Sequence, residues 1–86
     1  MSNMRHDELK VRLFPDVLQA EMTRKGASLR DLESQTGIPK STIGRKLSFG
    51  NFSLEEADRL SAALGMKLST LIRRAEALAS KEGESK

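Results

Sequence analysis

SLRDLESQTGIPKSTIGRKL, residues 28–47, is the stretch that decides the fold of this chain. It predicts two short helices joined by a tight turn at Gly37, where glycine adopts the left-handed backbone conformation without strain. The second helix is expected over residues 39–47. Ile43 and Leu47, four positions apart, form its buried pair.

The second of these helices is basic. It carries Lys40, Arg45 and Lys46 and no acidic residue, and the acids of the chain stop at Glu33 and resume at Glu55. The formal net charge of the whole chain is only +3 at pH 7, so this local distribution is more informative than the total. A local positive field attracts phosphate even when the overall charge is small. The basic helix therefore favours a nucleic-acid partner.

A further helix is expected before this pair, from Pro15 to Gly26, because proline suits the first helical position and glycine the C-terminal end. Its apolar stripe recurs every four residues at Phe14, Leu18 and Met22. Ser28 is a favoured N-cap for the next helix, and Asp31 three positions on completes an approximate capping box. Local signals thus define both ends of these elements.

Two more helices are expected after the basic one. A capping box of Ser53 and Glu56 begins the fourth helix, and Gly65 closes it. Its predicted buried face is Leu54, Ala57, Leu60 and Leu64. Ser69 is expected to cap the fifth helix. The apolar face of that helix is Leu68, Leu71, Ile72, Ala75 and Leu78. The fold class is therefore predicted to be all-α, with five helices in one small domain.

The chain is expected to contain three parts that differ in how well they are folded. Residues 1–13 are predicted to be an N-terminal arm, residues 14–80 the folded domain and residues 81–86 a disordered tail, which is charged and contains glycine. Residues 9–13 alternate apolar and charged side chains, which favours an extended arm. A helical turn broken at Pro15 is the alternative for this segment.

Composition excludes several classes of protein. There is no cysteine, so disulfides and thiolate zinc sites are ruled out, and the one histidine, His6, has no partner residues around it. The carboxylates Glu55, Glu56 and Asp58 crowd a helix start, where they stabilise the helix dipole. We therefore expect no enzymatic activity, no metal or other cofactor and no small-molecule ligand. No apolar run approaches membrane-spanning length, which predicts a cytoplasmic protein without a membrane partner.

Residues 29–72 resemble the helix-turn-helix domain of lambda-type phage repressors, Cro proteins and their XRE-like bacterial relatives. The shared features are Leu32, Gly37-Ile38, Ser41-Thr42-Ile43, Leu47 and the trailing pattern Leu60-x-x-x-Leu64-Gly65-x-x-Leu68-x-x-Leu71. The resemblance implies a five-helix lambda-repressor-like fold. It also implies a sequence-specific transcriptional regulator of the Cro or immunity-repressor kind, which binds a double-stranded DNA operator on the nucleoid of a bacterial host.

Three positions depart from the family pattern. Glu33 stands where a small residue is usual, near the crossing of the two motif helices, and must tilt outward or pair with Arg30 or Lys40. Lys46 stands where an apolar residue is common, and Leu47 is expected to take over its core role. Lys40 replaces a common glutamine. The departures bear on the DNA sequence that is read rather than on the fold.

Alignment with the family pattern assigns base contacts to Lys40, Ser41 and Arg45. The geometry agrees, since these residues and Gly44 lie opposite the inward-pointing Ile43. Arginine bonds guanine O6 and N7 in a bidentate manner, and lysine reaches the same acceptors. The expected contacts to the DNA backbone are Ser28, Arg30, Thr42, Lys46 and Asn51. Gly44 has two open interpretations, close approach to DNA or avoidance of a clash with a neighbouring helix.

A domain of this size binds a half-site weakly, so a homodimer on a palindromic operator is expected. The apolar stripe of the fifth helix over residues 71–79 has two interpretations, a cover for the core or a dimer contact. The arm over residues 9–13 is the other candidate for the dimer contact. The alternative function is a protein-interaction module, such as an antitoxin-like helix-turn-helix protein. In that case the basic helix would face protein instead of DNA.

Overall fold

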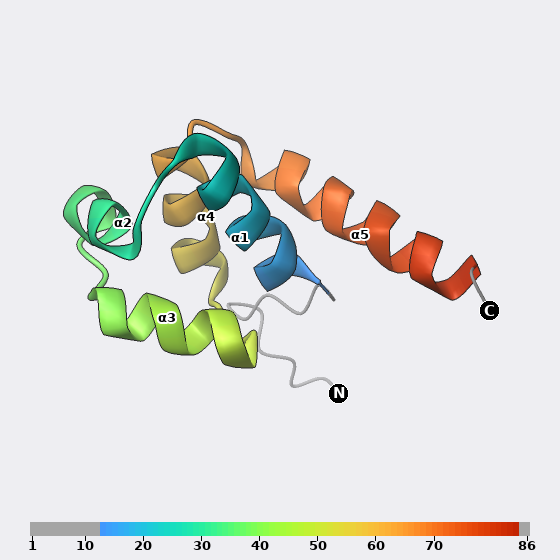
Figure 1. Ribbon diagram of the computed structural model, residues 1–86, viewed down its shortest axis with the longest axis horizontal. Coiled ribbons are helices and arrows are strands. Elements are labelled where there is room, and N and C mark those ends of the chain that lie inside the picture. Colours follow the sequence, from blue (N-terminus) through green and yellow to red (C-terminus); the bar gives the residue numbers. More distant parts are fainter. Residues whose placement is uncertain (1–12, 85–86) are drawn as a thin grey trace.

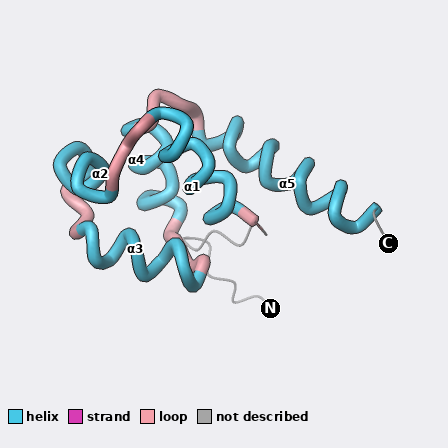
Figure 2. Tube along the Cα trace, viewed as in Figure 1, coloured by secondary structure: helices cyan, strands magenta, loops and turns pink. Residues whose placement is uncertain are grey.

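Five helices follow one another in the computed structural model, which describes residues 13–84, the last three as backbone only. They are α1 (Phe14–Lys25), α2 (Leu29–Thr36), α3 (Lys40–Phe49), α4 (Leu54–Ala63) and α5 (Leu68–Glu84) (Figure 1). Loops alone connect them, and the described part contains no strand (Figure 2). The predicted all-α class is therefore confirmed. The predictions for residues 1–12 of the arm, His6 among them, and for residues 85–86 of the tail lie outside the described residues.

Two capping boxes start helices as predicted. Ser28 Oγ accepts the backbone N–H of Asp31 at 3.1 Å, while the Ser28 N–H donates to Asp31 Oδ2 at 2.9 Å. Ser53 Oγ accepts the N–H of Glu56 at 3.0 Å, and the Ser53 N–H donates to Glu56 Oε1 at 2.9 Å. Each box satisfies backbone donors that the first helical turn leaves without partners, which is worth about 1 kcal/mol per cap.

The boundaries of α3 and α5 differ from prediction at both ends of each helix. Pro39 is the N-cap of α3 rather than its first residue, and the helix continues beyond residue 47 to Phe49. Ser69 does not cap α5, because the helix already begins at Leu68 and the carbonyl of Lys67 accepts the N–H of Thr70 at 3.0 Å. The α5 helix also extends to Glu84. Residues 81–84 therefore belong to a helix and not to the disordered tail expected there.

The core is built around α1, which packs against both α3 and α5, while α4 packs against α2 and α5. In this core the rings of Phe14 and Phe52 pack edge to face, with centroids 5.7 Å apart and planes at 79°. The predicted stripe of Phe14, Leu18 and Met22 is buried. Leu54, expected in the core, is instead 40% exposed. It is the first residue of α4, directly after the N-cap Ser53.

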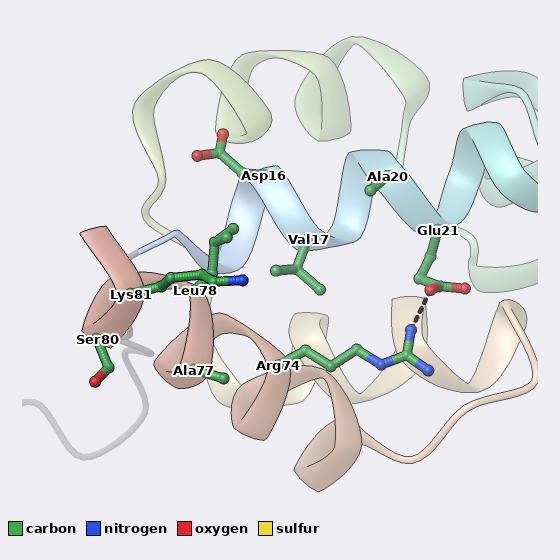
Figure 3. Close-up of a pocket in the computed structure, with 9 residues that line it drawn as sticks. All are labelled: Asp16, Val17, Ala20, Glu21, Arg74, Ala77, Leu78, Ser80 and Lys81. Atoms are coloured by element: carbon green, nitrogen blue, oxygen red, sulfur yellow. Dashed lines mark hydrogen bonds and ion pairs between the residues drawn. The ribbon is translucent and has the colours of Figure 1, made fainter. Parts of the chain in front are cut away.

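Glu21 is a buried acid that the apolar pattern did not reveal. Its side chain is only 5% exposed and lies between α1 and α5. Arg24 Nη2 donates to Glu21 Oε1 at 3.0 Å, and Arg74 of α5 donates to Oε2 (Figure 3). The hydrogen bond from Arg24, with help from the charge of Arg74, outweighs the effect of burial and lowers the pKa of Glu21. The ionised carboxylate therefore ties α5 to α1.

Beside this ion pair, α1 and α5 border an open groove (Figure 3). Its lining is largely apolar in the middle, with Val17 and Ala20 from α1 facing Ala77 and Leu78 from α5. Leu78 is 41% exposed there, whereas Leu71 and Ala75, earlier in the same stripe, are buried in the core. The predicted apolar stripe of the fifth helix thus covers the core with its first half and lines the groove with its second.

Candidate nucleic-acid interface

The turn between α2 and α3 is fixed by several local hydrogen bonds. Gly37 ends α2 with φ 81°, the left-handed conformation predicted for it, and its N–H donates to the Glu33 carbonyl at 2.8 Å. Thr36 Oγ1 donates to the Leu32 carbonyl at 2.7 Å and accepts the Ile38 N–H at 3.1 Å. Ile38 is buried. The turn therefore holds α3 at a set angle to α2.

One face of α3 packs inward and the opposite face points to solvent. Ile43 is fully buried, and Leu47 is half-buried against the core. Lys40, Ser41 and Arg45 are exposed, and their side chains form no hydrogen bond or ion pair with another residue in the described range 13–84. The helix lies along one edge of the molecule (Figure 1). Two cations and a hydroxyl thus stand free on an accessible helix face.

The chain matches the family model for the Cro/C1-type HTH DNA-binding domain over residues 17–76. The chain belongs to this family. The match spans more than half of the 86 residues and includes all of α2, α3 and α4. Neither a curated protein nor a solved structure gives a significant match. The resemblance noted in the sequence is therefore confirmed, and the chain is in general terms a DNA-binding regulator.

Lys46 occupies a different position in this Cro/C1-type domain from the other two cations of α3. Its Nζ donates to Glu56 Oε1 at 2.8 Å and to Oε2 at 3.1 Å. Burial works to raise the pKa of Glu56, but the hydrogen bonds from Lys46 and from the Ser53 N–H prevail and lower it. The sequence analysis had assigned Glu56 only to the capping box with Ser53 and had not predicted its ion pair with Lys46. The two residues lie ten positions apart on different helices, so no local pattern indicates their pairing.

The other residues expected at the DNA backbone are spread over three segments. Ser28 and Arg30 lie at the exposed start of α2, although Ser28 Oγ already accepts the Asp31 N–H. Thr42 is half-buried in the first turn of α3. Asn51 is exposed in the loop that follows Gly50, whose φ of 79° ends α3. Ser28, Arg30 and Asn51 thus lie near the two ends of the motif and Thr42 lies beside its central turn. Their contact with phosphate stays a prediction.

Gly44 does not lie on the exposed face where the sequence placed it. It is half-buried beside α2, in a hollow that Met22, Ala27 and Leu29 also line. A Cβ built on Gly44 would lie 3.4 Å from Leu29 Cδ1. Gly44 therefore faces a neighbouring helix, but an added Cβ would make little more than van der Waals contact there, so the geometry does not establish a clash.

Phe49 and Phe52, which bracket Gly50, have opposite surroundings. Phe52 is 1% exposed in the core, while Phe49 is 75% exposed at the last residue of α3. Glu33, the departure from the Cro/C1 pattern near the helix crossing, is half-buried and forms no ion pair with Arg30, Lys40 or another described residue. The expected ion pair is therefore not formed, and the outward tilt of Glu33 stays a prediction.

No cluster of metal-binding side chains occurs among residues 13–84. In the same range, no helix combines the length and apolar character needed to cross a bilayer.

Proposed function

We propose that this protein is a sequence-specific transcriptional regulator that inserts α3 into the major groove of double-stranded DNA. The observation that carries the proposal is the free outer face of α3, where Lys40, Ser41 and Arg45 are exposed opposite the buried Ile43. An α-helix fits the major groove, and side chains from its N-terminal half reach the base edges.

Each of the three residues has a distinct role in this proposal. Arg45 donates two parallel hydrogen bonds to guanine O6 and N7, which gives it geometric selectivity. Lys40 reaches the same acceptors as a point charge, with less directional constraint. Ser41 serves as donor or acceptor to a base or a phosphate. Base readout is therefore expected to depend most on Arg45.

Phosphate contacts are assigned to the start of α2, the first turn of α3 and the loop after α3. The residues are Ser28, Arg30, Thr42 and Asn51, joined by backbone N–H groups near Gly50. Lys46, expected in the same set, is held by Glu56 and is not needed for this assignment. These contacts fix the register of the domain on the duplex without reading its sequence.

A homodimer on a palindromic operator is the expected assembly, with half-sites about 34 Å apart. The groove between α1 and α5 supports a homodimer, because Leu78 is exposed there beside smaller apolar side chains that a second copy could cover. A dimer of this kind would repress transcription by occupying the operator and blocking polymerase. It would act on the nucleoid in the cytoplasm of a bacterial cell.

Binding-site selection from random duplex DNA tests the proposal, because it reports specificity and symmetry together. Enrichment of one palindromic sequence is the expected result. Recovery of no preferred sequence by a folded protein would contradict it.

A protein-interaction module is the second candidate, and one observation favours it. Phe49, a large apolar side chain at the end of α3, is 75% exposed, which suits a protein partner better than a phosphate backbone. A mobility-shift assay over a range of salt concentrations separates the two candidates. DNA binding that weakens steeply with salt supports the first, and no binding to any duplex at low salt supports the second.

A further inference from the structure

The three cations of α3 differ in what surrounds them. Lys40 and Arg45 are exposed and have no partner among residues 13–84. Lys46 contacts both carboxylate oxygens of Glu56, and the side chains of this pair are only 22% and 25% exposed. A basic helix presented to DNA therefore keeps one of its charges turned toward its own fold.

Glu56 is not free to leave this position. Its Oε1 accepts the Ser53 N–H at 2.9 Å while its own N–H donates to Ser53 Oγ at 3.0 Å, so the start of α4 anchors the carboxylate. The same oxygen atom accepts from Lys46 Nζ at 2.8 Å. The carboxylate thus offers the ammonium group what a DNA phosphate would offer, an oxygen acceptor with negative charge.

We propose that Glu56 is a positioning residue for DNA binding, which holds Lys46 away from phosphate and joins the second half of α3 to the start of α4. This inference rests on the proposed function, that α3 enters DNA. Each lysine that neutralises a phosphate adds affinity for any sequence, because it releases a counterion. By occupying Lys46, Glu56 lowers the affinity for random DNA and leaves base readout to Lys40 and Arg45.

The test compares three variants with the wild type on a random-sequence duplex, using fluorescence anisotropy at several salt concentrations. In Glu56→Gln the amide oxygen still accepts the Ser53 N–H, so the cap remains while the charge that holds Lys46 is lost. Glu55→Gln is the matched control. Glu55 lies in the same helical turn, and its loss breaks an exposed ion pair with Arg59 (2.7 Å) instead. Lys46→Gln removes the cation itself.

The slope of log K against log salt is the readout, because a purely structural ion pair would not change it. Glu56→Gln is expected to steepen the slope by roughly 0.9 per bound domain, the value for one added phosphate contact. Glu55→Gln and Lys46→Gln are expected to leave the slope unchanged, and Lys46→Gln added to Glu56→Gln should restore the wild-type slope. Thermal unfolding monitored by circular dichroism establishes that each variant is folded.

Three results would overturn the proposal. One is a flatter slope for Lys46→Gln, since it would place Lys46 on phosphate in the wild type. Another is an unchanged slope for Glu56→Gln, and the third is an equal rise for Glu55→Gln, which would reflect overall charge. In all three the wild type still binds DNA. Failure of the wild type to bind any duplex at low salt would instead overturn the proposed function itself.

Discussion

Glu21 of α1 accepts a hydrogen bond from Arg74 of α5, 53 positions later in the chain. The carboxylate is almost fully buried, whereas the side chains of its two partners, Arg74 and Arg24, remain 48% and 62% exposed. The pair closes the contact between the first and last helices, on the side of the molecule where the apolar groove begins (Figure 3).

Replacing this acid should weaken the fold. Glu21→Gln keeps the volume but removes the charge that both arginines face, which we expect to lower the free energy of unfolding by about 1–3 kcal/mol. Partial exposure of the arginines keeps the loss below that of a fully buried pair. Urea unfolding followed by circular dichroism measures it. Glu76→Gln, at an exposed position of α5, is the control and should change little. Equal effects of the two variants would contradict the prediction.

Stability should fall in acid. The folded-state pKa values of Glu21 and Glu56 lie below the ordinary value of 4.5. The unfolded chain therefore binds protons first as the pH drops. The stabilisation from these carboxylates is complete well above pH 4.5 and is lost as the pH falls through the lowered values.

Urea midpoints measured from pH 7 to pH 3 should show this decline. Glu21→Gln combined with Glu56→Gln should flatten the curve, because both titrating groups are then absent. A double variant whose midpoint falls as steeply as that of the wild type would rule out these two residues as the cause.

The two phenylalanines around Gly50 offer a matched pair of substitutions. Phe52→Ala removes a ring that is 1% exposed and packs edge to face on Phe14, and it should cost about 3–5 kcal/mol of unfolding free energy. Phe49→Ala removes a ring that is 75% exposed and should stay within about 0.5 kcal/mol of the wild type. Thermal or urea unfolding of both variants provides the comparison. A large loss of stability for Phe49→Ala would mean that its ring is covered in solution.

Base readout by Arg45 predicts a selective loss of affinity. Arg45→Ala should cost about 1–3 kcal/mol on the selected operator and relax the preference at one base position per half-site. Binding of a random duplex should change less, because only the charge is lost there. Titrations on both duplexes give the two values. Arg59→Ala, on α4, is the control. Equal losses on operator and random DNA would remove Arg45 from base reading.

The sequence was sufficient for the features that depend on neighbours in the chain. Ser28 and Ser53 indicated helix starts because a cap joins residues three positions apart. Gly37 indicated the turn because glycine readily adopts a positive φ. Ile43 showed which face of α3 points inward, since helical periodicity fixes the opposite face as well. The family motif, and with it the exposed position of Lys40 and Arg45, followed from such signals.

Only the tertiary structure decided which residues from different helices meet. It showed that Glu56 pairs with Lys46 and that Glu21 pairs with Arg74. The partners lie on different helices, so their spacing in the sequence does not predict the contact. It also turned Gly44 toward Leu29 instead of the solvent. Caps and periodicity act over about four residues, whereas these contacts depend on the angles at which whole helices pack. Local chemistry therefore determined where the helices are, and packing determined which charges remain free on α3.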